Sequence, residues 1–299
     1  MSFSSGVKDE LAAIPILSPC CLLAQAYGLA LFSRFFSYRS IVFSSEHELT
    51  ARLFSENMKS LVSISPQYER KSQKTHTVRI KTAAERASVM ELFGHSKTEP
   101  TLRLNRANLS DDCCFEAFLR GVFLACGTVT DPVKNYHIEF VVPHLKLSLD
   151  MVKLLNEMKF YPKRIVRKGS YVVYLKDSES IEDILTVMGA TNSSLVLMGI
   201  KMHKNMRNKV NRKVNFETAN LSKTVDASSR HIQAIELIES KTGLDALPEP
   251  LREAAEKRRD YPEKSLAELG RLFRKPISRS GVNHRLNKLV EIANKPEDQ

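Results

Sequence analysis

The chain has 299 residues, of which 42% are hydrophobic and 26% are charged. This composition excludes a disordered or fibrous protein, and the length is sufficient for about two globular domains. Lysine and arginine outnumber aspartate and glutamate by 45 to 34, so the net charge is +11 and nucleic acid is the natural partner to consider. Many basic proteins bind no nucleic acid, so the position of the charges along the chain must decide whether nucleic acid is the partner.

Four of the five cysteines form two adjacent pairs, and no CxxC spacing occurs. This pattern suits a reducing cytosol better than a disulfide framework or a zinc finger. The histidines also lack the HxxxH spacing of a metal site. We therefore expect no structural metal and no cofactor, and we interpret the cysteines as small hydrophobic residues.

An uncharged stretch between residues 11 and 33 is long enough to be considered as a membrane span. Pro15 and Pro19 would interrupt a spanning helix. The charged residues 8–10 that precede it do not form the basic start of a signal peptide. We therefore expect a soluble, cytoplasmic protein without a membrane segment.

Part of this stretch recurs later in the chain, because residues 20–34 and 113–127 align at a constant offset of 93. The alignment matches both cysteine pairs, Ala24 with Ala117, Gly28 with Gly121, and Leu31 with Leu124. Such an internal repeat predicts two related helices. A glycine within a helix costs about 1 kcal/mol relative to alanine. We therefore expect the two helices to meet nearly backbone to backbone at these glycines.

Similar elements follow each copy. After the first copy, the pattern predicts a strand, a helix, a strand and a helix at 40–43, 46–61, 76–80 and 83–93. After the second, it predicts a strand and a helix, then two strands around a Lys168-Gly169-Ser170 turn, then a helix, at 137–142, 145–158, 164–167, 171–176 and 181–188. Each half is predicted to run helix, hairpin, helix, hairpin, helix, which gives an α+β fold with a linker at 96–112.

The segment 118–129, FLRGVFLACGTV, resembles the LAGLIDADG helix of homing endonucleases, two copies of which form the core of a duplicated αββαββα pair. In that family the final acid of the motif binds the catalytic divalent metal. Superposing the motif's glycines on Gly121 and Gly127 assigns its acid positions in the two copies to Leu31, Ser33, Leu124 and Cys126. None of these residues supplies the carboxylate oxygens that Mg²⁺ requires. The nearest acid, Asp131, precedes Pro132 and is interpreted as a turn residue.

The segment 201–230 has eight basic residues against two acids and is predicted to be a basic connector. Its middle part, Asn211 to Thr224, contains several asparagines that suit capping and hydrogen bonds between modules. We expect this part to orient the two modules rather than to contact DNA bases.

The C-terminal segment contains the signals of two short helices. Residues 265–268, SLAE, form a capping box that predicts the start of the first helix. Residues 274–277, RKPI, interrupt this helix, and Ser278 is a suitable cap for the second. The inward face of the second helix is predicted to contain Val282, Leu286 and Leu289. This arrangement is a helix-turn-helix candidate, and its sequence also resembles the promoter-reading helix-turn-helix of primary sigma factors.

Between Arg271 and Lys288 the chain has six basic residues and one histidine but no acid. In a helix-turn-helix, the first polar residues of the second helix face base edges while flanking basic residues hold phosphates. The predicted DNA-binding residues are Ser265, Arg271, Arg274, Lys275, Ser278, Arg279, Ser280, Asn283, His284, Arg285 and Lys288. The alternative interpretation is a polar surface on a small helical bundle.

The degenerate LAGLIDADG pair, the stretch 211–224 and the ending SGVNHRLNKL together resemble the WhiA family of bacterial regulators. The resemblance implies a DNA-binding regulator of cell division, chromosome segregation and, in some bacteria, sporulation. It implies double-stranded DNA as the partner, with other transcription or division factors as further candidates, and neither a membrane nor a small-molecule substrate. The expected domains are two LAGLIDADG-like halves, 1–110 and 111–208, and a C-terminal DNA-binding domain, 209–299.

Two other functions stay open at this point. An architectural, nucleoid-associated protein that binds DNA without specific sites would share every DNA-binding feature of a regulator. An active homing endonuclease would require the acids that both copies lack. We expect a protein that is not an enzyme and that lies at the nucleoid in the cytoplasm.

Overall fold

The computed structural model describes residues 2–16, 18–70 and 75–294. It divides into two compact units, Met1–Lys204 and Asn205–Gln299, and each is described by itself. The first unit opens with the helix α1 (Phe3–Ala12) and then contains two similar halves.

The first half runs helix, two strands, helix, two strands, helix. Its elements are α2 (Pro19–Leu31), β1 (Phe35–Phe36), β2 (Ile41–Ser45), α3 (Glu48–Val62), β3 (Gln67–Arg70), β4 (His76–Ile80) and α4 (Ala83–Leu92). The four strands form one antiparallel sheet in the order β1-β2-β4-β3. A short 3₁₀ helix, η1 (Arg106–Asn108), lies in the segment that leads to the second half.

The second half repeats this order. Its elements are α5 (Asp112–Cys126), β5 (Gly127–Val129), β6 (Ile138–Val142), α6 (Leu145–Glu157), β7 (Lys163–Arg167), β8 (Ser170–Leu175) and α7 (Ser178–Met188). The sheet order, β5-β6-β8-β7, is the same as in the first half. Lys168 and Gly169 both have positive φ, at 50° and 77°, as a two-residue hairpin turn between twisted strands requires. The predicted α+β fold and this predicted turn are confirmed.

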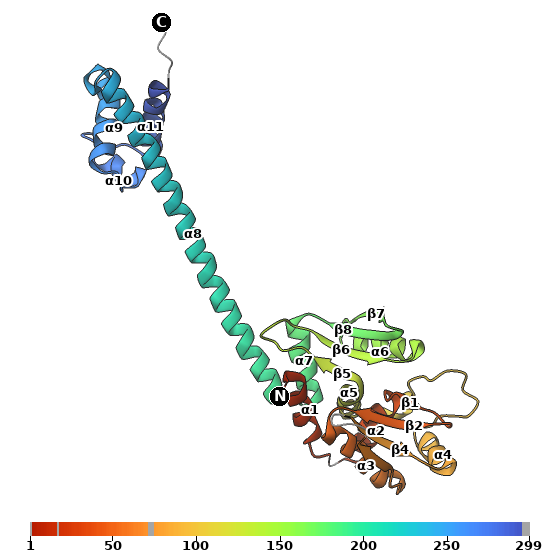
Figure 1. The fold of residues 1–299 in the computed structure, drawn as a ribbon. Coiled ribbons are helices and arrows are strands. Elements are labelled where there is room, and N and C mark those ends of the chain that lie inside the picture. The colour runs from red at the N-terminus through yellow and green to blue at the C-terminus, as the bar shows by residue number, and fades with distance from the viewer. Residues whose placement is uncertain (1, 17, 71–74, 295–299) are drawn as a thin grey trace. The chain divides into compact units, whose positions relative to one another are not determined.

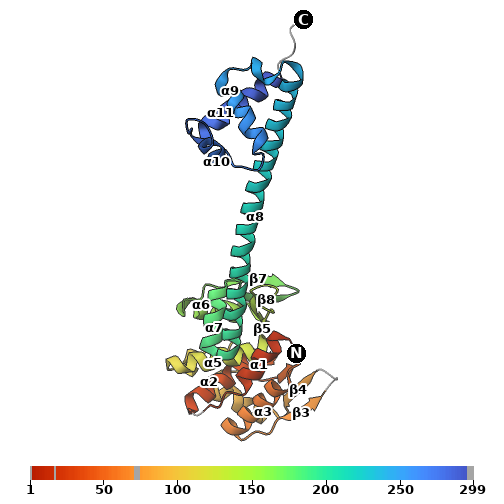
Figure 2. The same ribbon diagram turned by 90° about the vertical axis from the view of Figure 1, so that its left-hand side faces the viewer.

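The two central helices, α2 and α5, lie side by side in the core of this unit (Figures 1 and 2). Gly28 lies against the backbone of α5, where a Cβ atom would overlap the carbonyl oxygen of Phe118. Gly121 lies against α2, where a Cβ atom would overlap the carbonyl oxygen of Gln25. The glycines therefore permit the close backbone approach that the repeat predicted.

The second unit is helical. The helix α8 (Thr191–Lys241) begins in the first unit and runs for 51 residues. It is followed by η2 (Leu244–Ala246), α9 (Glu249–Asp260), α10 (Leu266–Arg271) and α11 (Arg279–Ala293). Figure 1 shows α9, α10 and α11 gathered beside the C-terminal part of α8. One core joins them, because buried residues of α8 and α9, such as Ile235, Ile238 and Ala255, belong to the same cluster as Leu286 and Leu289 of α11.

The uncharged stretch near the N-terminus is divided between two helices. α1 ends at Ala12 and α2 begins at Pro19. Among the residues that the structure describes, no helix is long and apolar enough to span a membrane.

Candidate DNA-binding surface and the former nuclease positions

Side-chain caps fix the starts of both helices of the helix-turn-helix. The Ser265 hydroxyl accepts a hydrogen bond from the Glu268 backbone N–H at 3.3 Å, and the Glu268 carboxylate accepts one from the Ser265 N–H at 2.9 Å. The Ser278 hydroxyl accepts one from the Gly281 N–H at 3.2 Å. Both helices therefore begin where the sequence predicted, because these caps satisfy backbone donors that a helix leaves unpaired.

The turn between α10 and α11 depends on Gly270, a residue that the sequence analysis did not single out. The Ile277 backbone N–H donates a hydrogen bond to the Gly270 carbonyl at 3.0 Å. A Cβ atom on Gly270 would overlap the Ile277 carbonyl oxygen and come within 3.3 Å of the Val282 side chain. The signal was a glycine near the end of a short, capped helix, followed by a turn without glycine.

The predicted inward face of α11 is confirmed. Val282, Leu286 and Leu289 are at most 1% exposed. They pack in one cluster with Leu269 of α10 and with Phe273. This burial fixes which side of α11 faces solvent.

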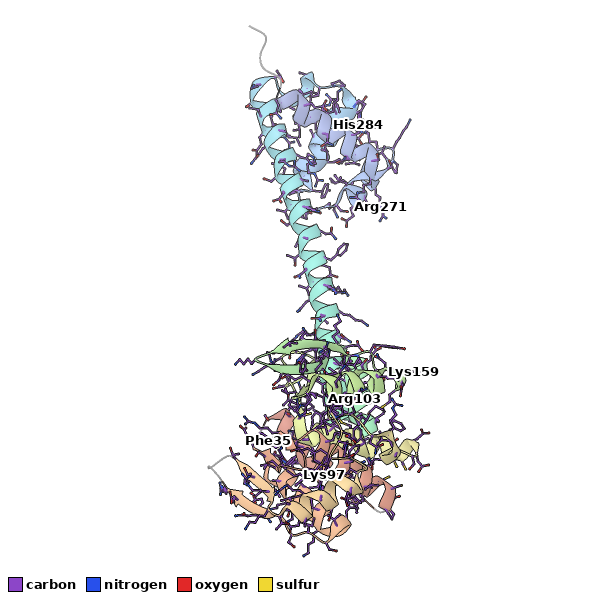
Figure 3. The ribbon with its side chains drawn as sticks, turned by 90° about the vertical axis from the view of Figure 1, so that its right-hand side faces the viewer. Phe35, Lys97, Arg103, Lys159, Arg271 and His284 are labelled. Carbon is purple, nitrogen blue, oxygen red and sulfur yellow. The ribbon has the colours of Figure 1, made fainter. Side chains whose placement is uncertain are left out.

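The opposite side of α11 and the turn carry most of the predicted DNA-binding residues. Nine of these residues are exposed: Arg271, Arg274, Lys275, Ser278, Arg279, Ser280, Asn283, His284 and Lys288. Figure 3 labels Arg271 and His284, whose side chains project from the surface of the helical unit. Ser265 and Arg285 are half-buried instead.

Some of these side chains already have protein partners. The Arg274 guanidinium donates to a Glu249 carboxylate oxygen at 3.1 Å, and the Arg274 backbone N–H donates to Glu253 at 2.7 Å. The Arg285 guanidinium lies over the Phe273 ring, 5.2 Å from its centroid. Among the residues that the structure describes, the remaining basic side chains of the set, such as Lys275, form no ion pair or cation–π contact.

A groove of about 680 Å³ adjoins the start of α11. Arg279 and Asn283 of α11 line it on one side, and Asn220, Lys223 and Thr224 of α8 line it on another. These α8 residues were predicted only as part of a basic connector, and their position beside the second helix was not predicted. The groove adds a lysine and two polar side chains to the surroundings of the predicted base-reading residues.

A buried arginine fixes the loop that precedes α10. Arg258 is 2% exposed, and its guanidinium donates to the Lys264 carbonyl at 2.8 Å and to the Pro262 carbonyl at 3.3 Å. The Ser228 hydroxyl of α8 donates to the same Pro262 carbonyl at 2.6 Å. Burial lowers the pKa of Arg258, and burial together with the positive charge of Arg258 lowers the pKa of His231 to about 4.

The positions aligned with the motif's acids lie at or just beyond the C-terminal ends of α2 and α5. Leu31 and Leu124 are fully buried in the core. The Ser33 hydroxyl donates to the Phe35 carbonyl at 3.3 Å. Burial raises the pKa of the Cys126 thiol to about 12, so this side chain is neutral at physiological pH. The four positions therefore present no negative charge to a metal ion.

The neighbourhood of these positions contains a lysine. The Lys8 ammonium lies 5.9 Å from the centroid of the Phe123 ring and interacts with Cys126 and Glu46, and burial lowers its pKa. The Asp131 carboxylate accepts a hydrogen bond from the Val133 N–H at 2.9 Å, which confirms its prediction as a turn residue. A nearby cation disfavours a divalent metal, and Asp131 has a structural partner.

The duplicated αββαββα unit and the C-terminal helices define a LAGLIDADG-like protein with a helix-turn-helix. Sequence comparison supports this class, since residues 115–207 match the WhiA LAGLIDADG-like domain and residues 210–293 match the WhiA C-terminal HTH domain. The probable cell division protein WhiA of Alkaliphilus metalliredigens is 39% identical over 99% of this chain and 98% of that protein. The chain belongs to the WhiA family.

Two further comparisons agree. The probable cell division protein WhiA of Ruminiclostridium cellulolyticum is 40% identical over 98% of this chain and 97% of that protein. The crystal structure of full-length DUF199/WhiA from Thermatoga maritima is 27% identical, with a TM-score of 0.60 over the full length of both chains. The resemblance found in the sequence is therefore confirmed.

Proposed function

We propose that this chain is a regulator that binds specific sites in duplex DNA through its helix-turn-helix and that it has no nuclease activity. The observation that carries the proposal is the exposed surface of residues 271–288, which is basic, contains no acid and includes the capped start of α11. The curated relatives carry the name probable cell division protein, which supports a regulatory role in the cell cycle. We place its action at the nucleoid.

Residues on the first turns of α11 read the base edges. Arg279 and Asn283 are exposed there, and their side chains suit bidentate hydrogen bonds to guanine and adenine. Ser280 and His284 lie on the same exposed side and add further donors. Specificity is therefore expected to depend on these four side chains.

The flanking basic residues hold phosphates. Arg271, Lys275 and Lys288 are exposed and lie at the end of α10, in the turn and late in α11. Arg274 contributes less, because DNA must compete with Glu249 for its guanidinium. Ser265 and Ser278 position the two helices through their caps, and Arg285 does so through Phe273.

Titration of the full-length chain against a mapped site and a scrambled duplex at several salt concentrations tests this division. The mapped site would come from genome-wide binding data. Asn283→Ala should weaken binding to the mapped site by about 1–3 kcal/mol and leave the scrambled duplex unchanged. Lys275→Ala should weaken binding to both duplexes similarly and reduce the salt slope by about one.

A charge-matched control is Lys59→Ala in α3 of the first unit, which removes one exposed positive charge outside the helix-turn-helix. This variant should bind like the wild type. Equal affinity of the wild-type chain for both duplexes would favour an architectural role instead. Unchanged binding by both Asn283→Ala and Lys275→Ala would assign DNA binding to another surface.

A further inference from the structure

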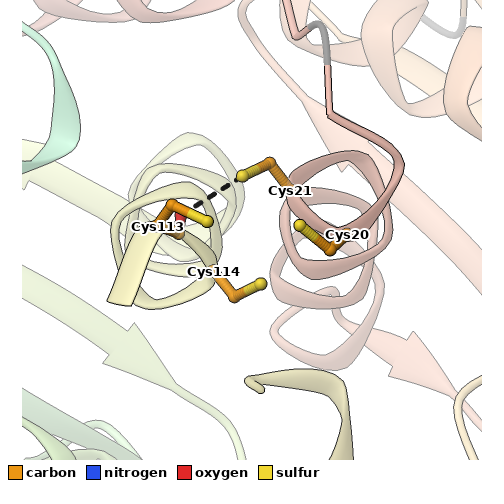
Figure 4. A group of neighbouring side chains, drawn as sticks. All are labelled: Cys20, Cys21, Cys113 and Cys114. Atoms are coloured by element: carbon orange, nitrogen blue, oxygen red, sulfur yellow. Dashed lines mark hydrogen bonds between the residues drawn. The ribbon is translucent and has the colours of Figure 1, made fainter. Parts of the chain in front are cut away.

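The N-terminal ends of α2 and α5 bring four cysteines together (Figure 4). Cys20 and Cys21 are the second and third residues of α2, and Cys113 and Cys114 are the second and third residues of α5. Their four sulfur atoms all lie within 4.8 Å of one another. The internal repeat explains the symmetry, since each half contributes one adjacent pair. We call this group the cysteine tetrad.

The spacing of the tetrad suits a single tetrahedral ion. A Zn–S bond of about 2.3 Å implies a sulfur-to-sulfur distance of about 3.8 Å in a tetrahedral site. The four sulfurs, which lie within 4.8 Å of one another, would have to move closer together to reach this distance. Four thiolates are the ligands of zinc or of iron–sulfur clusters, and so compact a group fits one ion better than a cluster.

The surroundings favour thiolates once a cation is present. All four cysteines lie in the first turn of a helix, where unpaired N–H groups and the helix dipole stabilise negative charge. The Ser18 hydroxyl lies 2.9 Å from the Cys20 sulfur and can donate to it, as outer hydrogen bonds do in metal sites.

The tetrad lies at the edge of the hydrophobic core, because Cys114 belongs to it and Cys20 and Cys21 pack against it. Only Cys114 of the tetrad is buried, while Cys20 and Cys21 are half-buried and Cys113 is exposed. An exposed edge gives a metal ion an entry path. The sequence did not predict this group, because the cysteines lack a CxxC spacing and the two pairs lie far apart in the chain. The fold brings the two pairs together.

We propose that Cys20, Cys21, Cys113 and Cys114 bind one zinc ion that links the N-terminal ends of α2 and α5. Four protein ligands leave no open position for water, so the ion is structural rather than catalytic. The site lies at the opposite end of α5 from Cys126, the position aligned with the motif's final acid. It is independent of the proposed DNA-binding role.

Elemental analysis of the full-length chain, purified under reducing conditions from zinc-supplemented cells, tests the proposal. We expect about one zinc per wild-type chain, and a Co²⁺-loaded chain should show the visible absorption of tetrahedral cobalt thiolate. Cys113→Ser changes an exposed residue and should reduce zinc affinity by about tenfold or more in competition with a chromophoric chelator. A double variant, Cys20→Ser with Cys113→Ser, should contain no zinc.

Cys126→Ser is the matched control, because Cys126 is the one cysteine outside the tetrad. It should retain the zinc content of the wild type. Chelator treatment should lower the melting temperature of the wild type and of Cys126→Ser but not that of the double variant. A reduced wild-type chain without zinc and without the cobalt spectrum would overturn the proposal. So would isolation of the chain with a disulfide between the two pairs, or equal zinc content in the double variant.

Discussion

Arg258 shows how a single buried side chain can support a surface that it does not itself form. Its guanidinium holds the carbonyls of Pro262 and Lys264, and these residues lie directly before the cap of α10. One of its nitrogens, Nε, has no hydrogen-bond partner in the structure. The burial of this cation costs free energy that the two carbonyl bonds offset. The position of the first helix therefore depends on a residue outside the helix-turn-helix.

Arg258→Met should destabilise the second unit by about 1–3 kcal/mol, because the Lys264 carbonyl loses its donor and the Pro262 carbonyl keeps only the Ser228 hydroxyl. It should also weaken binding to all DNA sequences alike, since α10 loses its fixed start. Arg259→Met is the control, because the neighbouring Arg259 is about half exposed and pairs with Glu239 on the surface. Urea unfolding and DNA titration of both variants measure the two effects. Equal stability of the two variants would contradict the role given to Arg258.

His231 makes the second unit sensitive to acid. Its pKa is lowered from 6.5 to about 4 in the folded chain, so the folded state binds fewer protons than the unfolded state between these values. The contribution of His231 to the free energy of unfolding is therefore fully present above about pH 6.5 and is lost as the pH falls toward 4. The loss attributable to this residue is at most about 3 kcal/mol.

Hydrogen exchange of α8 and α11 peptides at about pH 7 and pH 5, corrected for intrinsic exchange rates, measures this loss. His231→Gln should reduce the difference in protection between the two pH values. His284→Gln, which changes an exposed histidine of α11, should leave the difference as in the wild type. An unchanged difference in His231→Gln would show that other groups cause the acid sensitivity.

At the scale of elements, the central pair of helices was the most predictable part of the fold. Gly28 and Gly121 recur at the same position of the repeat, and close helix packing is the physical reason for a glycine within a helix. The long helix α8 was not predicted, because its middle part was interpreted from its basic charge alone. The apolar residues that recur there every four positions, Met202, Met206, Val210 and Val214, are exposed and do not pack in a core. Its sequence predicted only a basic connector.

The candidate DNA-binding surface, too, was predictable only where it depends on local sequence. Ser265 and Ser278 were predictable because capping acts within a few residues of sequence. The groove beside Asn283 and the hydrogen bond from Arg258 to the Pro262 carbonyl depend on packing between separate helices, which local sequence does not show. The cysteine tetrad depends on packing between the two halves, which no local spacing reveals.

Gly28→Ala should destabilise the first unit despite the better helix propensity of alanine. The added methyl group would overlap the Phe118 carbonyl oxygen, and such overpacking typically costs about 1–3 kcal/mol. Gly199→Ala in α8 is the control, because no other atom lies within 4 Å of an added Cβ there. This control should be stabilised by up to about 1 kcal/mol. Thermal unfolding distinguishes the two, and a Gly28→Ala chain as stable as the wild type would disprove the close approach.

At the scale of the whole molecule, the first unit has a LAGLIDADG-like scaffold, and two of the positions aligned with the motif's acids hold buried leucines. Leu31 and Leu124 contribute to the core that joins the two halves. Restoring a carboxylate at either position would bury an unpaired charge, which costs several kcal/mol. A carboxylate at Leu31 or Leu124 would therefore destabilise the folded state.

The wild-type chain should accordingly not nick supercoiled plasmid in the presence of Mg²⁺ or Mn²⁺, because no carboxylate lies at the four positions where the metal would be held. Gel analysis of plasmid topology over a protein titration measures this directly. Asp131→Asn is the diagnostic variant, because Asp131 is the acid nearest in sequence to the end of the second motif. Its carboxylate otherwise accepts a hydrogen bond within its own turn. Nicking by the purified wild type that disappears in Asp131→Asn and in chelator would establish a metal-dependent nuclease. Nicking that persists in this variant and in chelator would identify a contaminating activity, because chelator removes the metal on which a nuclease of this kind depends.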